Sequence, residues 1–81
     1  PSFGGAYNNR GGAYLRMGSY NEAIEDFSAA IKIRPDDAAA HYNLGLAYIK
    51  TGYREAALAH FRDAASLGLR QAEEYLKTLG E

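Results

Sequence analysis

The sequence predicts an all-α fold, an array of helical hairpins made of five helices in 81 residues. Three observations support this prediction. The chain repeats itself at an interval of 34 residues. Apolar residues recur every three or four positions, as on one face of a helix, and no stretch alternates strictly as a strand does. Glycines or a proline separate the apolar stretches, as turns between helices require.

The internal repeat aligns residues 4–37 with residues 38–71. Nine of the 34 aligned pairs are identical, whereas average composition gives roughly two by chance. The identical pairs are mostly small or aromatic: Ala6/Ala40, Asn9/Asn43, Gly11/Gly45, Ala13/Ala47, Tyr14/Tyr48, Gly18/Gly52, Ala23/Ala57, Phe27/Phe61 and Ala30/Ala64. Small residues let two helix axes approach closely, and the phenylalanines would fill the remaining volume. A repeat of this length indicates two helices in each unit.

The first unit contains two predicted helices. Tyr7, Gly11 and Tyr14 share a helix face, and Gly18 ends that segment. The second helix ends before Pro35, because a proline disfavours helical backbone at the residue that precedes it. Its apolar residues follow the same helical spacing: Tyr20, Ala23, Ile24, Phe27, Ala30 and Ile31.

The second unit repeats this plan, and a fifth helix follows it. Asp36 and Asp37 supply an N-cap and negative charge at the start of the helix that carries His41, Gly45 and Tyr48. That helix breaks at Gly52, and the next ends near Gly68. The apolar residues of the fourth and fifth helices are Ala57, Leu58, Phe61, Ala64 and Ala65, then Ala72, Tyr75, Leu76 and Leu79. Residues 1–5 contain two glycines and are predicted to be a frayed N-terminus, or a remnant that is not part of the repeats.

Composition excludes several classes of function. The net charge is −1, which argues against a protein that binds nucleic acids or anionic membranes by neutralising phosphates. No apolar run approaches the ~18 residues of a membrane-spanning helix. The absence of cysteine removes disulfides and thiolate chemistry, and it fits a cytoplasmic location. Because the chain begins with Pro1, a removed signal peptide stays compatible with it.

No residue pattern predicts an enzyme, a metal site or a cofactor. His41 is predicted to fill a position between helices and His60 to face solvent from a different helix, which argues against a shared site. The glycine pairs lack the spacing and the lysine of a phosphate-binding loop. None of the serines has the setting of an activated nucleophile: Ser2, Ser19, Ser28 and Ser66.

The 34-residue helix-turn-helix pattern resembles the tetratricopeptide repeat (TPR). The best match is the segment 42–48, Tyr-Asn-Leu-Gly-Leu-Ala-Tyr, and the resemblance extends over residues 4–71. It implies a right-handed TPR-type solenoid with one repeat over residues 6–37, a second over residues 38–69 and a capping helix over residues 70–81. The chain departs from the pattern at Arg10, Arg54 and Leu69. Sel1-like repeats are a related alternative, although their spacing fits less well.

The first helix of the second unit carries a second apolar stripe, Tyr42, Leu46 and Ile49. In the resembled family this stripe lines a concave groove that holds extended peptides. Either the fifth helix covers the stripe, or it is exposed as an interaction site with a gap over Gly12 beside Leu46. The predicted peptide-binding residues are Asn8, Asn9, Gly12, Leu15, Arg16, Tyr42, Asn43, Leu46, Ile49 and Lys50.

The predicted function is a non-catalytic protein interaction module whose partner is a protein or peptide. The alternative is a scaffold unit that self-associates into homo-oligomers through the same apolar surface. An RNA binder of the pentatricopeptide type is less favoured, because it requires 35-residue spacing and a basic inner face. The clamp for chaperone C-termini is not expected, since Asn8 and Gly12 stand where that subtype has its Lys and Asn.

Overall fold

In the computed structural model, which describes residues 3–81, the chain forms five α-helices and no strand. The helices are α1 (Gly4–Met17), α2 (Tyr20–Ile33), α3 (Ala38–Thr51), α4 (Arg54–Ser66) and α5 (Arg70–Thr78). The predicted all-α fold with five helices is therefore confirmed. No helix within residues 3–81 has both the length and the apolar character needed to cross a bilayer.

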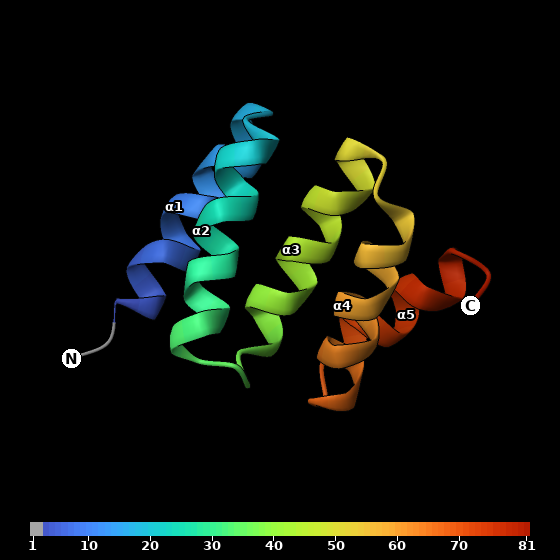
Figure 1. Ribbon diagram of the computed structural model, residues 1–81. Helices are drawn as coiled ribbons and strands as arrows, with labels where there is room; N and C mark the ends of the chain where they lie inside the picture. Colours follow the sequence, from blue (N-terminus) through green and yellow to red (C-terminus); the bar gives the residue numbers. More distant parts are fainter. Residues whose placement is uncertain (1–2) are drawn as a thin grey trace.

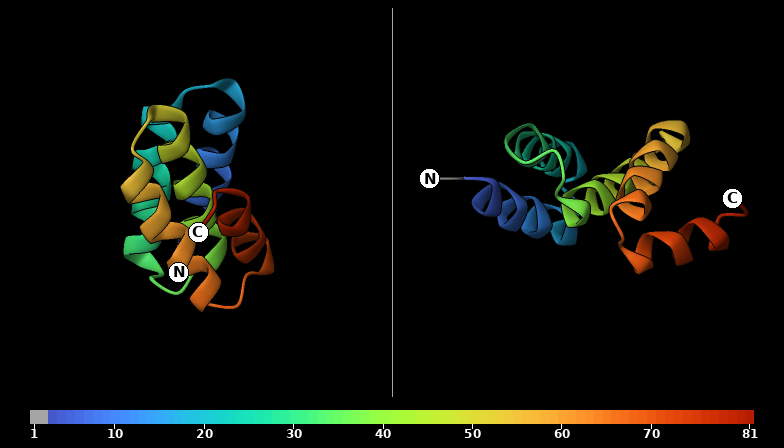
Figure 2. Two further views of the ribbon diagram at one scale, coloured as in Figure 1. Left: turned by 90° about the vertical axis from the view of Figure 1, so that its right-hand side faces the viewer. Right: turned by 90° about the horizontal axis from the view of Figure 1, so that it is seen from below.

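The helices form two successive antiparallel hairpins, α1–α2 and α3–α4, and α5 packs after them (Figure 1). Helix α3 packs against both α2 and α4, so the hairpins are joined through it. Viewed from below, α2 and α4 lie on one side of the molecule and α1 and α5 lie on the other (Figure 2). This arrangement is that of a helical hairpin solenoid.

Two equivalent glycines end the first helix of each hairpin. Gly18 and Gly52 have φ angles of 81° and 88°, in the left-handed region that glycine adopts without steric cost. Their backbone N–H groups donate to carbonyls of the last helical turn, which would otherwise lack partners. The breaks predicted at both positions are confirmed, and they have the same geometry.

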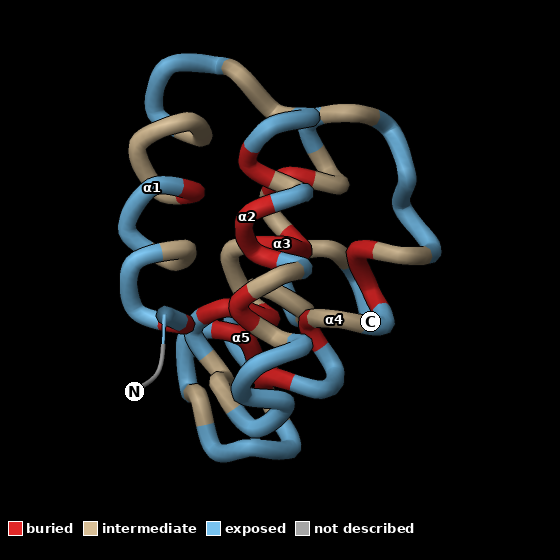
Figure 3. The backbone as a smooth tube through the Cα atoms, turned by 60° about the vertical axis from the view of Figure 1, so that its left-hand side comes forward, coloured by how far each residue is buried: buried red, intermediate tan, exposed pale blue. Residues whose placement is uncertain are grey.

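The core places a phenylalanine under a glycine in each hairpin. A Cβ atom on Gly11 would lie 2.8 Å from the Phe27 ring, and one on Gly45 would lie 2.7 Å from the Phe61 ring. Both phenylalanines are fully buried. Buried positions recur on the helix faces that meet neighbouring helices, while the outer faces are exposed (Figure 3). The close helix approach predicted from the small residues is therefore confirmed.

The N-terminal prediction needs a correction. Helix α1 begins at Gly4, so residues 4–5 are helical rather than frayed. Gly4 is buried, and the N–H of Tyr7 donates to the Phe3 carbonyl at 3.0 Å, which extends the helix to this point. Residues 1–2, which belong to the same prediction, lie outside the described residues.

Ion pairs explain two of the departures from the repeat pattern. Arg10 donates to both carboxylate oxygens of Asp26, at 2.7 and 2.8 Å, and Asp26 is almost fully buried. This hydrogen bond and charge pair raises the pKa of Arg10 well above its usual value. Arg54 donates to the Leu79 carbonyl at 3.0 Å and lies 3.6 Å from the carboxylate of Glu81. The two arginines thus connect α1 to α2 and α4 to the end of the chain.

Candidate binding site between α1 and α3

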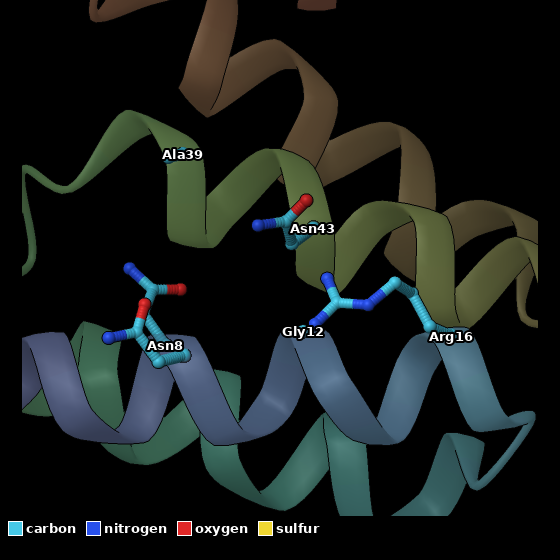
Figure 4. A pocket seen from close by; sticks show the side chains of 6 residues that line it. Asn8, Gly12, Arg16, Ala39 and Asn43 are labelled. Atoms are coloured by element: carbon cyan, nitrogen blue, oxygen red, sulfur yellow. The ribbon is translucent and has the colours of Figure 1, made fainter.

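A polar pocket of about 440 Å³ lies between α1 and α3 (Figure 4). Five of the ten predicted peptide-binding residues line it together with Ala39: Asn8, Asn9, Gly12, Arg16 and Asn43. Four are on α1, and Asn43 faces them from the equivalent helix of the second hairpin. The pocket therefore lies at the junction of the two repeats.

Asn8 connects this pocket to the start of α3. Its Nδ2 donates to Oδ2 of Asp37 at 2.8 Å, while Oδ1 of Asp37 accepts from the N–H of Ala40 and caps α3. Oδ1 of Asn8 is buried and has no hydrogen-bond partner among the described residues. A buried amide oxygen without a partner is unfavourable.

Arg16 brings a positive charge to the pocket. Its side chain folds along α1 until Nη1 lies 3.6 Å from the point where a Cβ of Gly12 would stand (Figure 4). None of the ion pairs in residues 3–81 includes Arg16. The gap expected over Gly12 is therefore partly taken by a guanidinium group, because the missing side chain gives Arg16 room to fold back.

The apolar stripe of α3 lies outside the pocket. The Tyr42 ring is 5.7 Å from the Phe61 ring and 6.3 Å from the Tyr75 ring of α5. This burial raises the pKa of Tyr42. Leu46 and Ile49 are half-buried. One end of the stripe is therefore in contact with α5, as one of the two alternatives expected.

The other predicted residues outside the pocket differ in their surroundings. Leu15 is half-buried and packs against the core cluster that includes Phe27 and Leu44. Lys50 is exposed. The participation of these residues and of the apolar stripe in binding stays a prediction.

Comparison with known proteins identifies the repeats. A family model described as "TPR repeat" matches residues 11–52, and one described as "Tetratricopeptide repeat" matches residues 38–68. The chain belongs to the tetratricopeptide repeat family. TPR domains generally mediate protein–protein interaction and are typically non-catalytic.

Two curated proteins are similar to this chain. The chain is 36% identical over 62 residues to Tetratricopeptide repeat protein 37 of Xenopus laevis and to Superkiller complex protein 3 of Homo sapiens. The alignment covers 76% of this chain but only 4% of each relative. The similarity therefore concerns the TPR unit and not the whole of these long proteins.

The hairpin of the second TPR brings together two histidines that sequence reasoning kept apart. Nδ1 of His41 lies 3.0 Å from Nδ1 of His60, and the His60 ring also stacks on Tyr48 with centroids 5.8 Å apart. His41 is buried, as predicted, but His60 is half-buried, so its prediction as a solvent-facing residue is wrong. In an antiparallel hairpin, residues at similar distances on either side of the turn face each other. His41 is 11 residues before Gly52 and His60 is 8 residues after it, so their positions around this turn could have predicted the contact.

The His60 environment predicts a pH-dependent stability. Burial lowers the pKa of His60 below 6.5, and the nearby His41 lowers it further, while Asp63 opposes the shift. The unfolded chain therefore binds this proton more readily than the folded chain. The contribution of neutral His60 to the free energy of unfolding is fully present above pH 6.5 and is lost as pH falls below this value. Urea unfolding at pH 7.5 and pH 5.5 measures the free energy of unfolding and checks this expected loss. A chelator keeps metal ions away from the two histidines during the measurement.

The matched variant for this pH series is His60→Gln, which removes the titrating group. The decrease in unfolding free energy between the two pH values should be smaller in the variant than in the native chain. An equal decrease in both proteins would show that another group is responsible.

Proposed function

We propose that this TPR domain binds an extended segment of a partner protein in the pocket between α1 and α3. The observation that carries the proposal is the unpaired guanidinium of Arg16 in a pocket that also contains the amides of Asn9 and Asn43. The family assignment supports a protein partner in general terms.

The side chains of the pocket suit a peptide with an acidic residue. A carboxamide offers both a donor and an acceptor, which matches the C=O and N–H of a peptide backbone. Asn43 and Asn9 can bind a backbone in this way from opposite walls. Arg16 can form a bidentate pair with a carboxylate, which is stronger than a neutral hydrogen bond. The partner segment is therefore expected to contain Asp or Glu.

Selection from a random peptide library on the immobilised 81-residue chain tests the proposal. We expect enrichment of sequences with an acidic residue. Asn43→Ala removes the hydrogen bonds of one amide, and Arg16→Gln removes those of the guanidinium. Each substitution should lower the affinity for the selected peptide by about tenfold, since such bonds contribute about 1–2 kcal/mol each. Isothermal titration calorimetry measures the affinities. Lys32→Gln is the matched control, because Lys32 is an exposed cation on α2 outside the pocket.

Two results would contradict the proposal. One is a selected peptide whose affinity changes equally little in Arg16→Gln, Asn43→Ala and Lys32→Gln. The other is that the chain enriches no peptide, while its apparent molecular mass in sedimentation equilibrium rises with protein concentration. If Leu46→Glu abolished that gain, self-association through the apolar stripe would be the better description.

A further inference from the structure

Three side chains with metal-ligating atoms converge between α3 and α4. His41 comes from α3, while His60 and Asp63 are one turn apart on α4. One potential ligand atom from each lies within 4.8 Å of the others. Nδ1 of His41 is 3.0 Å from Nδ1 of His60 and 3.9 Å from Oδ2 of Asp63. This cluster is separate from the pocket proposed to bind a peptide.

The backbone sets the proton position of His41. Nε2 of His41 lies 2.9 Å from the carbonyl oxygen of Pro35. A carbonyl can only accept, so Nε2 carries the proton and donates it. The neutral ring then presents a lone pair at Nδ1, towards His60 and Asp63. A histidine that donates one ring N–H to a carbonyl and offers the other nitrogen is the usual arrangement in metal sites.

The distances approach those of a tetrahedral zinc site. Zn–N bonds of about 2.0–2.1 Å place two nitrogen ligands of one zinc about 3.3 Å apart. The two imidazole nitrogens, 3.0 Å apart, need to separate only slightly. The Asp63 oxygen needs to move inward, which it can do because its side chain is 62% exposed.

The cluster is accessible from solvent. A pocket of about 300 Å³ opens beside it, lined by Pro35, His41, Asp63, Ser66 and Leu67. A metal ion can reach the ligands through this pocket. A water molecule there can complete four-coordination, as it does in zinc sites with three protein ligands.

We propose that His41, His60 and Asp63 bind a divalent transition metal of the zinc class, with water as the fourth ligand. Two imidazoles and one carboxylate form a donor set that suits zinc and similar ions better than magnesium or calcium. Without metal, Nδ1–H of His60 donates to Nδ1 of His41. Metal binding moves that proton to Nε2 of His60 and frees Nδ1, and the ion then links α3 to α4.

Zinc titration of the chelator-treated 81-residue chain tests the proposal. Calorimetry should give one zinc per chain, and zinc should raise the melting temperature, since a ligand of the folded state stabilises it. Nitrogen-15 NMR of the imidazole rings should show a metal-induced shift of Nδ1 in both His41 and His60. Asp63→Asn should weaken zinc binding at least about tenfold, and His60→Gln should abolish the site.

The control is Glu25→Gln, which removes one negative charge from an exposed position on α2 and should leave zinc affinity unchanged. Circular dichroism establishes that each variant is folded. If His60→Gln loses helicity, the exposed Asp63 position still decides the result. Absence of zinc binding, equal affinity in Asp63→Asn and Glu25→Gln, or unmoved Nδ1 resonances would overturn the proposal.

Discussion

Phe61→Ala is expected to lower the free energy of unfolding by about 3–5 kcal/mol, the usual cost of removing a buried aromatic ring. Phe61 is fully buried. Its ring lies 4.9 Å from the Tyr75 ring of α5 and 5.7 Å from the Tyr42 ring of α3. Removing the ring would leave a cavity bordered by three helices, α3, α4 and α5. For a domain of this size the loss is a large part of the total stability.

Urea unfolding followed by circular dichroism measures this loss. Phe3→Ala is the control, because Phe3 is 65% exposed and contributes little buried area. Hydrogen exchange should also show faster exchange for the amides of α5 than for those of α2 in the Phe61→Ala protein, since Tyr75 loses its contact. A loss below about 1 kcal/mol would mean that the neighbouring rings close the cavity.

Gly45→Ala and Gly12→Ala are expected to change stability in opposite directions, although both glycines are inside helices. A Cβ on Gly45 would lie 2.7–2.9 Å from three atoms of the Phe61 ring, which cannot move away because other rings pack against it. Overpacking of this kind costs about 1–3 kcal/mol. A Cβ on Gly12 would meet only the guanidinium of Arg16, at 3.6 Å. Alanine should therefore stabilise α1 there by up to about 1 kcal/mol.

Thermal unfolding of the two variants distinguishes these effects. In a domain of this size, a change of 1 kcal/mol shifts the melting temperature by roughly 4–8 °C. Gly45→Ala should melt below the native protein and Gly12→Ala above it. Gly11→Ala, one position before Gly12, should also melt lower, because a Cβ there would lie 2.8 Å from the Phe27 ring. If Gly11→Ala and Gly12→Ala changed the melting temperature equally, helix propensity rather than packing would determine the effect of alanine at these positions.

The elements of the fold were predictable because they depend on local and repeated information. Gly18 and Gly52 end helices through their own backbone geometry. The two glycine–phenylalanine pairs were predictable because the repeat places the same residues in both units. The beginning of α1 was not predictable, since its glycines suggest a frayed end, whereas the structure begins the helix at Gly4.

The contacts of the candidate sites depend on pairs that are distant in sequence and not repeated. The same is true of Arg10 and Asp26, 16 residues apart, which form a partly buried ion pair outside these sites. The equivalent residues in the second repeat are Leu44 and His60. The path of Arg16 over Gly12 depends on a rotamer, which composition does not determine. Five of the ten residues predicted to bind a peptide line the pocket between α1 and α3, but the sequence did not predict that this pocket is mainly polar. That these residues bind a peptide stays a prediction.

Asp37 is expected to couple the pocket between α1 and α3 to the joint between the two repeats. One of its oxygens caps α3 while the other holds Asn8 of α1. A partner that draws Asn8 away therefore changes the free energy of the first turn of α3, and a shift of α3 changes the position of Asn8. Such coupling is reciprocal. The free energy by which a bound partner would favour one orientation of the hairpins equals the free energy by which that orientation would favour binding.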